Sequence, residues 1–224
     1  MSNRDQEFSQ LARDRKTAKI LARDGAEVVY SEEVTNQSNQ QVLAAIADAG
    51  FAPFHYARGT DGLVEPWRFH ILWQNECRLI GRQLADWYPD MKPSNKLPPM
   101  LAACGCLVLV NWLPQFQSEE SEAAGESAEK KLQVDEEHLA ATAAATQNLL
   151  LSLAAKGMPT YWSSGGFFRQ HSMFERLQIP TSERLLAAIF VSYGIDDSME
   201  VIFGKNAPHR SDPNKWTREV SLDG

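Results

Sequence analysis

The stretch "RKTAK" places two cations and a hydroxyl group at a spacing that suits an anion. Arg15 and Lys19 are four residues apart, and Thr17 lies between them. On a helix or at its end, the two cations would share a face, and the hydroxyl group of Thr17 would add a hydrogen bond. Basic pairs on surface helices are more often simply solvated. The stretch therefore indicates an anion site only in combination with other features.

A second candidate is the glycine-rich turn "WSSGG", which spans residues 162–166. Paired glycines permit the close approach of backbone N–H groups to a ligand. Taken alone, the pattern is better explained as an ordinary tight turn between two helices, and that interpretation is favoured.

The third candidate is a long loop, "APFHYARGTDGLVEPW", which carries His55, Arg58 and Asp61. Its Pro66-Trp67 step leads into an extended segment, because proline fixes its own φ and biases the preceding residue toward extended geometry. A lone histidine in such a loop is more often a surface residue than a ligand. The "CGC" at 104–106 lacks a second pair of metal ligands at suitable spacing, so its cysteines are expected to act as small apolar residues.

Composition excludes several classes of protein. The 224 residues are 43% hydrophobic and 23% charged, as in an ordinary globular protein. The net charge of −7 argues against general nucleic-acid binding. No apolar stretch is long enough to span a membrane, no export signal is recognisable, and three cysteines without a pairing pattern suit the cytoplasm. No GxSxG, Walker or GxGxxG motif is present.

The elements that must position these candidates follow from periodicity and from capping signals. Helices are predicted over 5–23, over 36–49 (with Asn36 or Ser38 as cap), over 75–87, over 135–157 and within 168–179. Strands are predicted at 67–73, in the apolar run "CGCLVLVNW" and in "RLLAAIFVSYG". "KPSNKLPPM" is predicted as a connector and "GMPTYWSSGGFF" as a loop.

One domain is predicted to cover residues 1–224. Residues 117–131 hold five glutamates and two lysines without a large apolar group, which is typical of a solvated insertion, and a lid over a site is the alternative. Residues 205–224 form a polar, extended C-terminal tail in which Trp216 and Val220 are possible anchors.

In this order, the motifs resemble those of the FMN-dependent nitroreductase family. "RKTAK" is similar to the basic motif that ends the family's first helix, and "APF" and "EPWRF" to the two ends of its flavin loop. "ATQNLLLSLAAKGM" is similar to its long helix, "YWSSGGF" to its glycine turn, and "SYG" followed by "KNAPHR" to its end. The resemblance runs from about residue 11 to about residue 210, and the joint order is more specific than any one motif.

The resemblance implies an α+β, nitroreductase-like fold, with a central mixed, mostly antiparallel sheet flanked by helices, in an intertwined homodimer. It also implies FMN as cofactor, NADH or NADPH as co-substrate, and a ping-pong reaction. In that reaction hydride passes through flavin N5 to an oxidised acceptor such as a nitroaromatic or a quinone, and no side chain serves as a nucleophile.

The residues that match the family's cofactor motifs are assigned by this resemblance. Arg15, Thr17 and Arg210, with Lys205, are expected at the phosphate, Lys19 at the ring edge, and the amides of the glycine turn near the flavin N5 and O4. The full set expected to bind the cofactor comprises Arg15, Lys16, Thr17, Lys19, Pro53, Phe54, His55, Ser164, Gly165, Gly166, Lys205 and Arg210.

Three positions depart from the family pattern: Phe54, Leu63 and Glu65 stand where serine, asparagine and glutamine are usual. These changes keep two alternatives open, namely a specialised flavin reaction (dehalogenation, enone reduction or flavin fragmentation) and a flavin-binding member without catalysis. A helical interaction domain without a cofactor is the third.

Overall fold

The computed structural model describes residues 3–57, 62–89, 96–115, 127–205 and 209–221. Its helices and 3₁₀ turns are α1 (Asn3–Asp14), η1 (Arg23–Gly25), α2 (Glu32–Ala49), α3 (Gln74–Trp87), α4 (Leu97–Ala103), α6 (Ala128–Ala155), η2 (Gly166–Arg169), α7 (His171–Arg176) and η4 (Pro213–Lys215). Its strands are β1 (Ala18–Ala22), β2 (Trp67–Trp73), β3 (Cys106–Trp112), β4 (Thr160–Ser163), β5 (Arg184–Val191) and β6 (Met199–Phe203).

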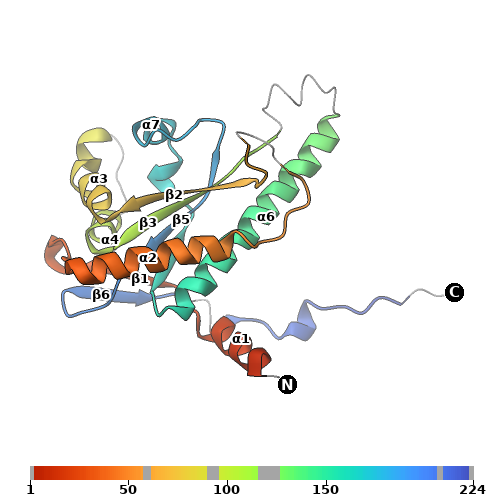
Figure 1. Cartoon of the computed structure of the whole chain (residues 1–224), viewed down its shortest axis with the longest axis horizontal. Helices are drawn as coiled ribbons and strands as arrows, with labels where there is room; N and C mark the ends of the chain where they lie inside the picture. The colour runs from red at the N-terminus through yellow and green to blue at the C-terminus, as the bar shows by residue number, and fades with distance from the viewer. Residues whose placement is uncertain (1–2, 58–61, 90–95, 116–126, 206–208, 222–224) are drawn as a thin grey trace.

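Two sheets meet edge to edge. The larger has the order β2-β3-β5-β4 and is antiparallel throughout, and the smaller pairs β1 with β6, also antiparallel. A single parallel bridge between Thr17 and Thr160 joins β4 to the start of β1. The predicted mixed, mostly antiparallel sheet flanked by helices is confirmed (Figure 1).

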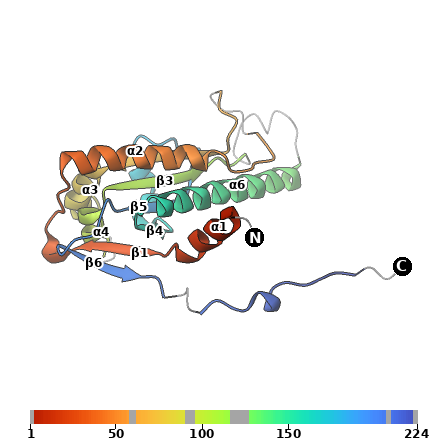
Figure 2. The same cartoon turned by 60° about the horizontal axis from the view of Figure 1, so that its bottom comes forward.

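Helices cover both faces of the larger sheet. On one face α2 and α6 pack against β3 and β5 through Val42, Leu149, Leu153, Val108 and Ile189, which are all fully buried. On the other face α3, α4, η2 and α7 pack on Leu107 and Leu109. Figure 2 shows α2 along the top of the molecule, with β1 and β6 below the larger sheet.

The aromatic strand predicted at 67–73 is β2, and its alternation is as expected. Phe69, Ile71 and Trp73 pack toward the α2–α6 side, whereas Leu72 belongs to the opposite cluster. Trp67 is buried and makes an edge-to-face contact with Phe54, with ring centroids 5.5 Å apart. The Pro66-Trp67 step therefore anchors the preceding loop.

Several predicted boundaries are wrong. The helix predicted over 5–23 ends at Asp14, and residues 18–22 form β1 instead. Ala18, Ile20 and Ala22 share one cluster with Met199 of β6, so pairing with a distant strand overrides a local helical pattern.

Two helices begin earlier than predicted because serines cap them. Ser31 accepts a hydrogen bond from the Val34 N–H (3.3 Å), so α2 begins at Glu32 and neither Asn36 nor Ser38 is its cap. Ser127 accepts from the Lys130 N–H (3.2 Å), so α6 begins at Ala128 rather than at 135. Residues 127–131 of the predicted insertion thus belong to α6 and its cap, and its residues 117–126 lie outside the described chain.

Two other segments hold more structure than predicted. The second half of the predicted connector is α4, since Pro98 and Pro99 occupy its first turn, where proline is tolerated. The predicted loop 157–168 contains the short strand β4 and the turn η2. Within the described residues, no helix is both long and apolar enough to cross a membrane.

Candidate functional site

One cavity gathers predicted cofactor residues from distant parts of the chain. It has a volume of about 390 Å³ and lies where β4, β5, η2 and the start of α4 meet. Three of the twelve predicted residues line it: Lys19, Gly165 and Gly166. The remaining lining residues are Lys96, Leu97, Met100, Tyr161, Ser163, Phe167, Phe168, Gln170 and Phe190. The cavity is thus largely aromatic and apolar, with two lysines and a glycine turn at its wall.

Lys19 reaches this cavity from the smaller sheet. Its Nζ lies 4.5 Å from the centroid of the Tyr161 ring, and Tyr161 in turn stacks on Phe190, with 6.0 Å between ring centroids. A cation over an aromatic face is attracted by the ring quadrupole, so the ammonium group is held at the cavity wall. The bridge between Thr17 and Thr160 brings β1 beside β4 and places Lys19 there.

The glycine turn has the conformation that its sequence predicts. Gly165 and Gly166 have φ values of 106° and 51°, in the region that favours glycine. The Gly165 N–H donates to Ser163 Oγ (3.2 Å), and the Gly165 carbonyl accepts from the Phe168 N–H (3.0 Å). Among the described residues the Gly166 N–H has no hydrogen-bond acceptor, so Gly166 offers the free amide at this wall. Ser164 is exposed and does not line the cavity.

The basic residues before β1 lie beside the end of β6. The Gly204 N–H donates to the Thr17 carbonyl (2.9 Å), which continues the β1–β6 register and brings Lys205 next to this segment. A side chain at Gly204 would place its Cβ 3.1 Å from Thr17 Cβ, so the glycine permits the close approach. Arg15 is half-buried, and Lys16 and Lys205 are exposed. The five-residue stretch is not helical beyond Arg15, so Arg15 and Lys19 do not share a helix face.

Arg210 lies in the exposed segment that follows β6 and leaves the folded body alongside α1 (Figures 1 and 2). Its expected place at a phosphate group stays a prediction.

The predicted loop residues lie at a different cavity. Pro53, Phe54 and His55 line a hollow of about 370 Å³ against α6, together with Glu137, Ala140, Ala141 and Ala144. Among the residues that the structure describes, none lines both this hollow and the first cavity. Within one chain, therefore, the flavin-loop residues and the Lys19–Gly165–Gly166 group form two separate surfaces.

The cysteines lie in the core. Cys77 and Cys106 are fully buried, and burial raises the pKa of the Cys106 thiol. The pKa of the Cys77 thiol is raised by its hydrogen bond with Cys104 and then by burial. Within the part of the chain that the structure describes, no three His, Cys, Asp or Glu side chains gather in a metal-binding arrangement.

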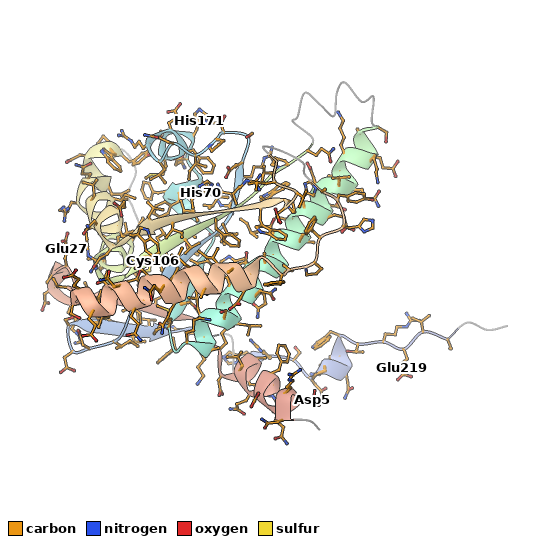
Figure 3. All side chains as sticks on the ribbon, viewed as in Figure 1. Asp5, Glu27, His70, Cys106, His171 and Glu219 are labelled. Carbon is orange, nitrogen blue, oxygen red and sulfur yellow. The ribbon has the colours of Figure 1, made fainter. Side chains whose placement is uncertain are left out.

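Sequence reasoning missed the aromatic wall of the first cavity. Tyr161 and Ser163 alternate with Trp162, which is the signal of a short strand that would have placed both on one face. A polar group on β2, on β3 and just before β5 was also missed: Glu183 Oε2 lies 2.6 Å from His70 Nε2 and accepts from Asn111 Nδ2 (2.9 Å). Figure 3 labels His70 on β2 and His171 at the start of α7.

With this geometry described, comparison with solved structures defines the class of fold. The chain has the nitroreductase-like fold. It is similar to a nitroreductase-like family protein from Bacillus cereus, with 13% identity, a TM-score of 0.63 and 96% of each chain covered. It is also similar to the nitroreductase CinD from Lactococcus lactis in complex with nicotinic acid, with 14% identity, a TM-score of 0.58, and 92% of this chain and 98% of that one covered.

A third similar structure is an iodotyrosine deiodinase bound to FMN and 3-iodo-L-tyrosine, with 18% identity, a TM-score of 0.50, and 84% of this chain and 90% of that one covered. No protein-family model matches the sequence, and no curated protein matches it. At these identities the comparisons establish the fold.

Proposed function

We propose that this protein is an FMN-dependent oxidoreductase that takes reducing equivalents from NADH or NADPH and passes them to an oxidised acceptor such as a nitroaromatic or a quinone. The observation that carries the proposal is the first cavity. Residues 19, 165 and 166, selected from motifs far apart in the sequence, line one aromatic hollow. Nitroreductase-fold structures are similar to this chain, and one of them holds FMN.

The residues present fit a phosphorylated, planar aromatic cofactor. A volume of about 390 Å³ lies in the range of ligand pockets, and Tyr161, Phe167 and Phe190 offer apolar walls for a ring. The free Gly166 N–H and the Lys19 ammonium group are donors at the same wall. Bound FMN would supply the hydride chemistry, and the protein would supply binding, orientation and charge.

The phosphate group would be held by the basic residues before β1. Arg15, Lys16 and the hydroxyl group of Thr17 are two to four residues from Lys19, and Lys205, two residues after β6, follows Gly204, which is hydrogen-bonded to Thr17. Charge-assisted hydrogen bonds from such a group are the strong class of hydrogen bond. Lys19 would then stabilise negative charge on a reduced ring.

A homodimer would join the two separate surfaces. The hollow lined by Pro53, Phe54 and His55 lies against α6, whose Leu132 and Leu139 are exposed. In a dimer, this loop of one subunit would close over the first cavity of the other. The exposed tail, with Trp216 at 71% exposure, would reach the partner.

The first test is the visible spectrum of the purified protein and its bleaching by NADH or NADPH. The phosphate assignment is tested by Arg15→Ala, which removes a half-buried cation before β1. We expect FMN affinity to fall about tenfold or more, because a charge-assisted hydrogen bond is lost. Quenching of FMN fluorescence on titration measures the change.

Arg13→Ala is the matched control, since it removes an equal charge from an exposed position two residues earlier. Full flavin loading in Arg15→Ala would show that the phosphate assignment is wrong. A colourless wild-type protein that does not take up FMN would contradict the proposal as a whole.

A second candidate function is reductive dehalogenation, which is favoured by the similarity to the deiodinase. A panel of nitroaromatic, quinone and iodinated aromatic acceptors separates the two candidates by product. A protein that binds FMN and turns over none of them would be a flavin-binding protein without this catalysis.

A further inference from the structure

Arg169 bridges the segments that follow β4 and lie within β5, at the point where these two strands stop pairing beside the first cavity. Its Nε donates to the Ser164 carbonyl, and its Nη2 donates to the Leu186 carbonyl (3.2 Å). The last register pair between β4 and β5 is Ser163 with Ala188. The Ser164 carbonyl is one residue beyond this last pair on one side and the Leu186 carbonyl two residues beyond it on the other, so both lie past the end of the β4–β5 ladder.

An irregularity in β5 leaves one of these carbonyls outside the β3–β5 ladder. Val110 of β3 pairs with Ala187, and the next residue, Asn111, pairs with Leu185. Leu186 is thus the extra residue of a β-bulge, which leaves it unpaired with β3. Its carbonyl accepts the hydrogen bond from Arg169 instead.

The segment held in this way is the glycine turn at the cavity wall. Phe167 and Phe168 are buried and fix its far side. A Cβ at Gly165 would lie 2.4 Å from Leu185 Cδ2 and 3.4 Å from Arg169 Cγ, so Gly165 packs tightly on Leu185 and lies in contact distance of the Arg169 side chain. The Ser164 end of the turn is held by the Arg169 guanidinium group, whose hydrogen bonds to the Ser164 and Leu186 carbonyls replace the β4–β5 ladder hydrogen bonds that end at Ser163.

Only arginine suits this place among the cationic residues. A guanidinium group presents donors from several nitrogens in one plane and can bridge two carbonyls at once, whereas the ammonium group of lysine is a compact point charge. Arg169 also lines a separate hollow of about 210 Å³ with Glu183 and Arg184, and it is not among the residues that line the first cavity. It therefore contacts the turn without lining the first cavity.

We infer that Arg169 is a positioning residue that holds the Gly165–Gly166 turn in the conformation in which it lines the cavity, and so sets how tightly the cofactor is bound. The effect on the cofactor rests on the proposed function, whereas the effect on the turn does not. Arg169 does not line the first cavity and acts through the backbone of the turn.

The test measures amide hydrogen exchange across residues 162–168 in the full-length protein, with and without FMN, for wild type, Arg169→Met and Arg169→Lys. Arg169→Met removes both hydrogen bonds, and we expect about tenfold faster exchange in this segment. Arg169→Lys keeps the charge and loses the bridge, so its exchange should lie between the other two.

Arg176→Met is the control for charge. Arg176 is exposed in α7, with its guanidinium carbon 4.6 Å from the centroid of the Trp87 ring, and its loss removes the same charge. Exchange in 162–168 should equal wild type in this variant. If it rises as much as in Arg169→Met, the effect is one of charge and the inference is wrong.

FMN titration of the same variants gives the second readout. We expect the dissociation constant of Arg169→Met to rise about tenfold and that of Arg176→Met to stay unchanged. If wild type does not bind FMN, the proposed function fails, and hydrogen exchange still decides the role of Arg169. If Arg169→Met exchanges at the wild-type rate across residues 162–168, the inference is overturned. If Arg169→Met does not fold, the same result in Arg169→Lys overturns it.

Discussion

Gly165 is the residue at which backbone conformation and packing restrict the site most strongly. Its φ of 106° is a conformation that other residues rarely adopt, and a Cβ there would lie 2.4 Å from Leu185 Cδ2. Two independent requirements thus exclude a side chain at this position. The second arises because the turn packs on Leu185, which adjoins the bulge in β5.

We expect Gly165→Ala to lower the free energy of unfolding by about 2–4 kcal/mol, because the energetic cost of a left-handed backbone conformation is added to the cost of overpacking against Leu185. Chemical denaturation measures the change. Gly166→Ala is the matched control: Gly166 has a φ of 51°, and a Cβ there meets nothing within 4 Å, so only about 1 kcal/mol of strain is expected. Equal losses in the two variants would contradict the role of the Leu185 contact.

The residues of the site could be predicted from sequence only where their type carries the information. Lys19, Gly165 and Gly166 were identified because cations and paired glycines suggest anion and ligand contacts. Tyr161 carried a signal, its alternation with Ser163 around Trp162, that was overlooked. Phe190 could not be predicted, because an aromatic residue in an apolar strand has the same pattern whether it faces the core or a cavity. Arg169 had no sequence signal, since its two acceptors are backbone carbonyls.

At the scale of elements, α4 depends on one buried arginine. Arg78 of α3 donates to the carbonyls of Leu101, Cys104 (2.9 Å) and Val28 (2.9 Å). Only 5% of Arg78 is exposed. Two of these carbonyls lie at the end of α4, where a helix leaves acceptors unsatisfied. The guanidinium group therefore caps α4, which forms part of the cavity wall.

We expect Arg78→Met to lower the free energy of unfolding by about 2–4 kcal/mol, because buried carbonyls lose their donors. Thermal or chemical denaturation measures it. Arg82→Met, one turn later on α3, removes an exposed guanidinium group that pairs with Glu27 and should cost less than about 1 kcal/mol. A loss in Arg82→Met as large as that in Arg78→Met would show that the capping contacts carry no special weight.

Elements with strong local patterns were predicted, and elements that depend on distant partners were not. β2, β3 and β5 are long apolar or alternating runs, and α3 has a clear periodicity, so their sequences suffice. β1 was predicted as helix and β6 was not predicted, because each is a five-residue strand whose ladder partner, within the described part of the chain, is the other alone. The early starts of α2 and α6 show that serine caps were overlooked.

At the scale of the whole molecule, the C-terminal segment has few contacts with its own chain. Residues 209–221 are exposed throughout, including Trp216 and Val220, and the segment runs away from the sheet (Figure 1). Figure 3 labels Glu219 on this C-terminal segment, well away from His70 and Cys106 in the folded body. An exposed tail with a large aromatic residue suits contact with a second subunit.

We expect removal of residues 209–224 to weaken the proposed homodimer while the subunit stays folded, because the tail packs on little of its own chain. Analytical ultracentrifugation over a range of concentrations measures dimer dissociation, and circular dichroism reports the fold. Trp216→Ser is the milder variant and should weaken the dimer in the same direction. Unchanged dissociation in both variants would contradict a dimer held by the tail.

The pairing of β1 with β6 has a consequence for how the protein is made. Ala18 faces Phe203, so the strand that carries Lys19 finds its partner only after synthesis has continued through residue 203. Closing so large a loop is slow, and the unpaired strand edge stays open to other chains meanwhile. The nascent protein therefore passes through most of this synthesis with β1 unpaired, and its vulnerability to aggregation falls in that interval.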